Sequence, residues 1–224
     1  TGFNNVAVGQ RALYFNTTGG TNVALGRMAN YKNTTGSGNV GVGLQTLYNN
    51  QTGSDNIAIG VNANHYGLGS TNISIGTNAM NGDQLGGTST GTENVGIGYR
   101  SLFAYTTGSK NTALGHETLY SATTESELTA VGYKAARSNT TGSKLTAIGS
   151  YAAQWNYNGE NNTAIGHSAL YNSGSGSNDN VAIGVNALYG DTVGYSVTGE
   201  KNVAVGNSSL DSNSSGQSNI AIGH

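Results

Sequence analysis

The chain repeats one short pattern of apolar, small and polar residues. In Asn5-Val6-Ala7-Val8-Gly9 a small residue stands between two larger apolar ones, with Asn before them and Gly after them. The closing Gly recurs thirteen times, and eight of the twelve spacings between successive copies are 17 residues. Self-similarity at a fixed spacing is the signature of a repeat architecture. We therefore treat residues 1–224 as a single repeat array of about twelve turns, mostly of 17 residues.

Alternation within each copy predicts a short strand, because apolar residues stand two apart on either side of the small one. A small residue and usually a larger apolar one follow three and four positions after the Gly, as in Ala12-Leu13 and Thr46-Leu47. We interpret this pair as a second short strand, and the intervening Asn-Thr-Thr-Gly segments as turns. A helix of the leucine-rich-repeat kind is the alternative. It is disfavoured because no copy holds the 10–12 residues of helical periodicity that a helix needs.

A unit of 17 residues is too small to bury its own apolar face, so the units must stack. Stacking places Val on Val and Leu on Leu in ladders with a step of about 4.8 Å. The Asn that opens the motif is present in eleven of thirteen copies, and Leu128 and Leu145 replace it in the others. We expect its amide to hydrogen-bond between turns, and the recurrent Gly to supply a positive φ or a close backbone approach. The predicted fold class is all-β, a β-solenoid.

The small column of the strand is predicted to face away from the Val, Ile and Leu column. Thirteen small residues in a row indicate close packing against another surface, and the simplest such surface is the same column of another copy. The alternative is that a thin coil leaves no room for anything larger at this position. The predicted homo-oligomer interface consists of Ala7, Ala24, Ala58, Ala113, Ala130, Ala147, Ala164, Ala182, Ala204 and Ala221.

Composition excludes several classes of protein. The chain has 36 Gly but no Pro and no Cys, so it is not collagen and has no disulfide or thiolate metal site. Leu, Ile, Val and Phe make up about 18% of it, below the roughly 20% expected for an ordinary globular core. The net charge is −2 and no Lys/Arg cluster is present, which argues against binding to nucleic acid. No apolar run approaches membrane-spanning length, so direct membrane insertion is not expected.

Catalytic residues, cofactors and metal sites are not predicted. No acidic column persists along the repeat, and Glu125 and Glu127 are interpreted as the solvated edge of one turn. His116, His167 and His224 share a column directly after the Gly, but His116 and His167 are roughly 14 Å apart at the strand spacing, too far for joint ligation within one chain. Three copies of one such His could bind a metal or anion only if this column lay near a threefold axis.

Aromatic residues stand five positions after the Gly in seven copies. Such a column suits contact with a sugar or a protein, or the rings stack on each other and cover the end of the Leu ladder. Two 22-residue spacings add enlarged turns near residues 82–92 and 190–200, and the second of them contains Tyr195, a further exposed contact candidate. The aromatic column consists of Tyr14, Tyr31, Tyr48, Phe103, Tyr120, Tyr171 and Tyr189, and it is interrupted at His65, Asn81, Arg137, Gln154 and Asp211.

Two known groups of repeats resemble these. Asn180-Val181-Ala182-Ile183-Gly184-Val185-Asn186-Ala187-Leu188 resembles the head repeats of trimeric autotransporter adhesins of the YadA type. The longer form, Ala-Leu-Tyr followed by Asn-Thr-Thr-Gly, is similar to repeats in phage and virus tail-fibre proteins. The resemblance implies a left-handed parallel β-roll, three copies of which pack around a common axis. It further implies an extracellular, non-enzymatic adhesive or fibre segment, on a cell surface or virion, that contacts a host surface glycan or protein.

Two other functions fit the sequence. Glycosylation sequons begin at Asn16, Asn33, Asn50 and Asn139, so the chain could be a glycan-decorated filament unit. Regular Thr positions in the turns suggest an ice-binding filament, although the Thr column fails at Gly67-Leu68 and Tyr157-Asn158.

Overall fold

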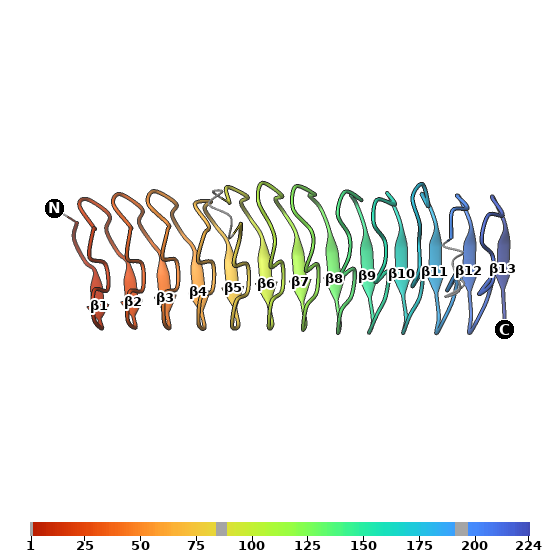
Figure 1. Ribbon diagram of the computed structural model, residues 1–224, viewed down its shortest axis with the longest axis horizontal. Helices are drawn as coiled ribbons and strands as arrows, with labels where there is room; N and C mark the ends of the chain where they lie inside the picture. The colour runs from red at the N-terminus through yellow and green to blue at the C-terminus, as the bar shows by residue number, and fades with distance from the viewer. Residues whose placement is uncertain (1, 84–88, 191–196) are drawn as a thin grey trace. The chain divides into compact units, whose positions relative to one another are not determined.

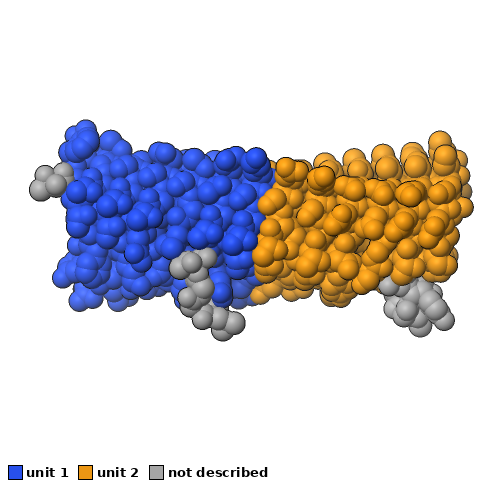
Figure 2. All heavy atoms as spheres, turned by 90° about the horizontal axis from the view of Figure 1, so that it is seen from above, with its two compact units in different colours: residues 1–111 blue, residues 112–224 orange. Residues whose placement is uncertain are grey.

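The computed structural model describes residues 2–83, 89–190 and 197–224. The chain divides into two compact units, residues 1–111 and residues 112–224, which Figure 2 distinguishes by colour. Each unit is a parallel β-solenoid, and no described residue lies in a helix. The predicted all-β solenoid of about twelve turns is therefore confirmed, and the helical alternative is not.

Every strand has three residues, and within each unit neighbouring strands pair in parallel, turn on turn (Figure 1). Equivalent repeat positions face each other, as in the pairs Val40 with Ile57 and Gly41 with Ala58. The strands of the first unit are β1 (Val6–Val8), β2 (Val23–Leu25), β3 (Val40–Val42), β4 (Ile57–Ile59), β5 (Ile73–Ile75) and β6 (Val95–Ile97). Those of the second are β7 (Thr112–Leu114), β8 (Thr129–Val131), β9 (Thr146–Ile148), β10 (Thr163–Ile165), β11 (Val181–Ile183), β12 (Val203–Val205) and β13 (Ile220–Ile222).

Each strand ends at a glycine that no other residue could replace without strain. Gly43 has φ +136°, and a Cβ built on it would lie 2.7 Å from the carbonyl oxygen of Gly60 in the next turn. L-residues rarely adopt this φ, and the clash is with backbone, which cannot move aside. The prediction that the recurrent Gly supplies a positive φ or a close backbone approach is confirmed, and Gly43 has both.

The predicted second strand is wrong, because the segment after each glycine is a turn. In residues 44–49 the backbone enters the left-handed region twice, at Gln45 (φ 55°) and Leu47 (φ 49°). Thr46 and Leu47 are both fully buried, whereas a strand sends successive side chains to opposite faces. Hydrogen bonds to neighbouring turns persist: the Leu47 N–H donates to the Ala63 carbonyl at 3.1 Å. These bonds and the buried side chain offset the roughly 1–2 kcal/mol cost of a left-handed residue.

The small column faces inward, so the predicted alanine interface is wrong. Eight of its alanines are 0% exposed within the single chain and cannot reach another copy: Ala24, Ala58, Ala113, Ala130, Ala147, Ala164, Ala182 and Ala204. Ala7 and Ala221 are more exposed because a turn covers each from one side only.

The alternative, that the coil is too narrow for larger residues, is confirmed. Side chains from the opposite wall fill the interior: a Cβ on Gly96 would lie 2.6 Å from Cγ of Met80. The larger Val, Ile and Leu side chains of the strands therefore point outward.

Two ladders fill the inside of each solenoid. Leucines such as Leu47, Leu102 and Leu188 are fully buried four positions after the glycine. The predicted Asn ladder is also confirmed. Oδ1 of Asn39 accepts hydrogen bonds from the backbone N–H and Nδ2 of Asn56, at 3.1 and 3.0 Å. Nδ2 of Asn39 donates to the Gly53 carbonyl at 2.8 Å. Each amide thus satisfies backbone groups in the adjacent turn, which have no access to water.

Candidate functional site

The outward face of the strands is an apolar surface. Its two columns hold only Val, Ile, Leu and Thr in every strand, without a charged residue. Ile59 is 39% exposed and Leu114 is 45% exposed. In the second unit the first column changes to threonine in four successive turns, at Thr112, Thr129, Thr146 and Thr163. Contiguous exposed apolar patches mark interaction surfaces in soluble proteins.

The predicted aromatic column exists, and many of its rings stack on each other. The Tyr31 ring lies 5.7 Å from Tyr14 and 5.0 Å from Tyr48, nearly parallel to both. In the second unit Tyr171 and Tyr189 stack at 4.9 Å, and the Arg137 guanidinium lies 4.9 Å from the Tyr120 ring centre. The predicted ring stacking is confirmed for these residues, while their use as a contact surface stays a prediction. Tyr195 lies outside the described residues.

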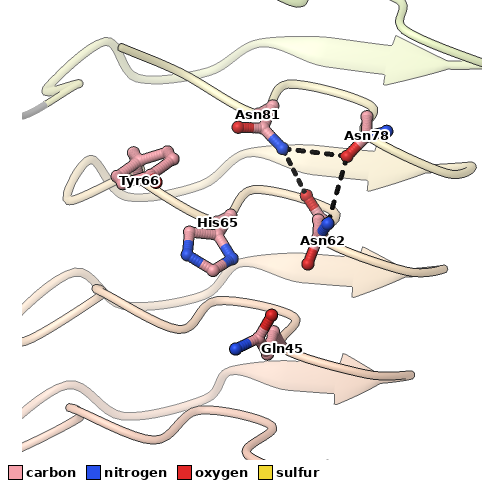
Figure 3. Close-up of a pocket in the computed structure, with 6 residues that line it drawn as sticks. All are labelled: Gln45, Asn62, His65, Tyr66, Asn78 and Asn81. Carbon is pink, nitrogen blue, oxygen red and sulfur yellow. Dashed lines mark hydrogen bonds between the residues drawn. The ribbon is translucent and has the colours of Figure 1, made fainter. Parts of the chain in front are cut away.

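A polar cavity opens in the first unit where the aromatic column is interrupted. Asn81 takes the place that a tyrosine has in other turns, and its smaller side chain leaves space beside it. The cavity has a volume of about 390 Å³ (Figure 3). It is lined by Gln45, Asn62, His65, Tyr66, Asn78 and Asn81.

Three stacked amides form one wall of the cavity. Gln45, Asn62 and Asn78 follow β3, β4 and β5 at the same repeat position and have φ between 54° and 56°. Asn tolerates this left-handed conformation better than most residues. Nδ2 of Asn62 donates to Oδ1 of Asn78 at 3.3 Å, and Nδ2 of Asn81 donates to the same oxygen at 3.1 Å. The Asn62 carbonyl also accepts from Nδ2 of Asn81 at 3.3 Å. These bonds fix the orientation of Asn62 and Asn81.

Three polar atoms of this cavity are buried without a hydrogen-bond partner. They are Oδ1 of Asn62, Oδ1 of Asn81 and Nδ1 of His65. Asn81 is only 4% exposed. An unsatisfied buried acceptor costs about 1–3 kcal/mol, so most such groups in folded proteins are paired with protein, water or a ligand. The three atoms are also shielded from solvent, so this part of the fold carries a desolvation cost that no hydrogen bond to these atoms offsets.

His65 contributes a neutral ring to the cavity. Burial lowers the pKa of His65 because it desolvates the imidazolium; the Gln45 backbone opposes this shift, and the charge of Lys32 adds to it. The ring stacks on Tyr48 at 4.9 Å and lies 4.5 Å from Tyr66. None of the six lining residues is acidic, and none is Lys or Arg, so the cavity is uncharged at neutral pH.

Glu125 lies in a different environment from the one that its sequence context predicts. Glu125 is buried, which corrects its interpretation as a solvated edge. Its Oε2 accepts from the backbone N–H groups of Thr123 and Thr124 at 2.6 and 3.1 Å. It does so in the turn where Ala122 replaces the usual amide. The described part of the chain holds no group of three or more His, Cys, Asp or Glu side chains placed to bind a metal ion.

The asparagines and threonines that suggested glycosylation and ice binding make hydrogen bonds within the solenoid. The sequon residues Asn33 and Asn139 are fully buried and donate to the carbonyls of Gly36 and Gly142 at 2.9 and 2.7 Å. Asn50 is buried in the same way. Turn threonines such as Thr34 and Thr140 donate their hydroxyls to the next turn. This argues against glycosylation of these folded turns and against a free Thr surface for ice.

Sequence reasoning missed the cavity, although it noted the two interruptions of the aromatic column that border it, His65 and Asn81. Among the described residues no helix is long and apolar enough to cross a membrane. No family model, curated protein or solved structure matches the chain.

Proposed function

We propose that the chain is a non-enzymatic structural and adhesive segment of an extracellular fibre, whose copies associate through the outward face of the strands. The observation that carries the proposal is the pair of uncharged columns of Val, Ile, Leu and Thr on that face. Each turn adds one step to both columns, so the face continues for as long as each solenoid does.

A second copy of the same chain is the occupant that fits this face best. Its side chains repeat at the strand spacing of about 4.8 Å, and another copy repeats at the same spacing. The first column of one chain then packs against the third-residue column of the next, a heterologous contact that closes into a ring. A ring of three agrees with the resemblance to trimeric adhesin heads. The interface is thus assigned to residues such as Ile59, Ile148 and Ile183, in place of the buried alanines.

Adhesion would use the surfaces that remain outside such a ring, namely the aromatic column and the turns. The continuous inter-turn hydrogen bonds make each solenoid a stiff support for these surfaces. Localisation on a cell surface or a virion fibre, and contact with a host glycan or protein, form part of the same proposal.

Sedimentation velocity over a range of protein concentrations tests the assembly. The expected result is a species with three times the chain mass that persists on dilution. A chain that stays monomeric at every concentration would refute association through this face. Binding of the assembled protein to host-type surface glycans and proteins tests the adhesive part separately.

A further inference from the structure

A second pocket, in the second unit, is lined mainly by aromatic side chains. It lies between two successive turns and has a volume of about 330 Å³. Among the described residues, Trp155 and Tyr157 line it from the turn after β9, and Tyr171 and Asn172 line it from the turn after β10. Concave sites that combine aromatic side chains with a few polar groups are typical ligand sites.

The aromatic pair Trp155 and Tyr157 is an exception to the repeat. One turn earlier, Ser138 and Thr140 occupy the same two positions. The solenoid therefore does not require aromatic side chains there. The two rings lie 6.2 Å apart, with their planes tilted by 40°.

The neighbouring turns hold these rings in place. The Trp155 N–H donates to the Tyr171 carbonyl at 3.0 Å, and the Tyr157 carbonyl accepts from the Thr140 N–H at 2.8 Å. The Tyr171 ring stacks on Tyr189 at 4.9 Å, nearly parallel to it. Because the pocket is largely formed before any ligand arrives, binding requires little ordering of side chains.

The polar groups of the pocket are open to solvent. Tyr157 is 44% exposed. In the described part of the chain nothing hydrogen-bonds to the indole N–H of Trp155 or to the hydroxyl of Tyr171, and neither group is enclosed. A ligand in the pocket can therefore contact both ring surface and hydrogen-bonding groups.

We propose that this pocket binds a neutral saccharide. This inference names a ligand class for the adhesive surface proposed above and rests on that proposal, but it concerns a site within one chain and needs no assembly. The C–H face of a sugar ring packs on aromatic rings such as Trp155, which have an apolar body and a polar group at the edge. Sugar hydroxyls accept from the indole N–H and exchange hydrogen bonds with the tyrosine hydroxyls.

Other ligand classes fit less well. None of the four lining residues is charged, so an anion lacks a cationic partner and a metal ion lacks a carboxylate. A quaternary ammonium ion would use the ring faces, but it would cover the N–H and hydroxyl groups without bonding to them. The volume of about 330 Å³ lies at the lower end of ordinary small-molecule sites, about 300–1,000 Å³, which suits a small saccharide.

Two variants remove the aromatic surface with substitutions that the repeat already tolerates. Trp155→Ser and Tyr157→Thr each install the residue that the preceding turn has at the same position. The matched control is Tyr133→Ser. It removes an aromatic residue of the second unit that is 41% exposed but lies outside the pocket, and Ser150 occupies its position in the next turn.

Trp155 is the only tryptophan of the chain, so its fluorescence reports on this pocket alone. The probes are methyl glycosides of glucose, galactose, mannose and N-acetylglucosamine, with choline and N-acetylneuraminic acid as the charged comparisons. Fluorescence titration measures binding to the full chain, and saturation-transfer NMR measures it in Trp155→Ser as well. We expect at least one neutral glycoside to change the Trp155 emission, with affinity reduced about tenfold or more in both pocket variants and unchanged in the control.

Three results would overturn the inference: no neutral glycoside binds, only a charged probe binds, or binding persists in the two pocket variants. Circular dichroism confirms that each variant is folded. Binding to host-type surface glycans that persists in Trp155→Ser and Tyr157→Thr would support the adhesive role and overturn only the pocket. The mass of the wild-type protein in the same samples reports on the assembly separately.

Discussion

Two lysines on the outward strand face should dissociate the proposed assembly while leaving the fold intact. The variant combines Ile148→Lys and Ile183→Lys, in β9 and β11. One strand, β10, lies between them, so the new charges are about 9–10 Å apart at the strand spacing. Their mutual repulsion is then largely screened at ordinary salt. Both side chains point outward, so a single folded chain accommodates the change.

The expected loss follows from the exposed fractions. Ile148 is 39% exposed and Ile183 is 37% exposed, so an interface would bury the remaining third or more of each side chain. Full burial of such a side chain is worth about 1.5–3 kcal/mol, which leaves about 0.6–1.2 kcal/mol for each residue. Two residues give about 1–2 kcal/mol per interface, equivalent to a roughly tenfold weaker association. Two ammonium groups at the interface add several kcal/mol each in desolvation, which should abolish the ring.

Analytical ultracentrifugation at several concentrations measures the effect. The wild type is expected to sediment as a multimer and the variant as a monomer with the same circular dichroism spectrum. The control, Asn158→Lys with Ser175→Lys, adds the same charge at exposed turn positions of the second unit and should leave the mass unchanged. If the variant sediments as the wild type does, the outward face is not the interface and the reasoning fails.

Three further predictions concern the solenoid itself. Asn39→Ala should lower the free energy of unfolding by about 1–3 kcal/mol in urea titrations, because it leaves the buried Asn56 N–H without a partner and removes one of the two donors to the Gly53 carbonyl. A loss below about 1 kcal/mol would contradict the Asn ladder. Gly43→Ala should lower the free energy of unfolding by about 3 kcal/mol or more, because its Cβ meets backbone. Gly176 has φ +84° and nothing within 4 Å of an added Cβ, so Gly176→Ala should lower it by only about 1 kcal/mol. Equal urea midpoints for the two variants would refute the role of close backbone approach at Gly43. The lowered pKa of His65 means that the unfolded chain takes up this proton first as the pH falls below the ordinary value of 6.5. Between pH 7.5 and 5.5 the free energy of unfolding of the wild type should therefore fall more than that of His65→Tyr. An equal change in the two proteins, measured by denaturant titration at both pH values, would contradict this prediction.

The sequence predicts the solenoid because one spacing recurs along the whole chain. Glycines such as Gly43 and the Asn ladder were also assigned correctly, since the chemistry of these residues allows few other roles. The direction of the strand faces was wrong because alternation separates two faces without saying which one is inside. For the strand residues, the usual rule that the larger apolar side chains are buried fails. The interior is already filled by residues of the turns, such as Met80 and Leu47, which leaves room only for a small side chain from the strand.

The second strand was wrong for a related reason. Thr46 and Leu47 are adjacent and both buried, which requires the left-handed backbone at Gln45 and Leu47. Neither Gln nor Leu favours the left-handed conformation, so the sequence gives no sign of it at these positions. The packing of the neighbouring turns imposes it. The cavity depends on packing between turns, so a single turn read alone could not reveal it. Asn81 becomes informative only when it is set against Tyr48 at the same position.

Among the described residues, the backbone hydrogen bonds between turns connect each turn only to its neighbours. The Val40 N–H, for example, donates to the Asn56 carbonyl, and the Val23 N–H donates to the Asn39 carbonyl. The free energy of such a stack is close to a sum of nearest-neighbour terms, so no turn depends on a distant one. Deleting or duplicating residues 23–39, one complete turn, would therefore rejoin the ladders in register. Recombination within the gene can therefore change the length of a solenoid in steps of one turn, about 4.8 Å each. Adding or removing one turn leaves the surface that the other turns of the solenoid present unchanged.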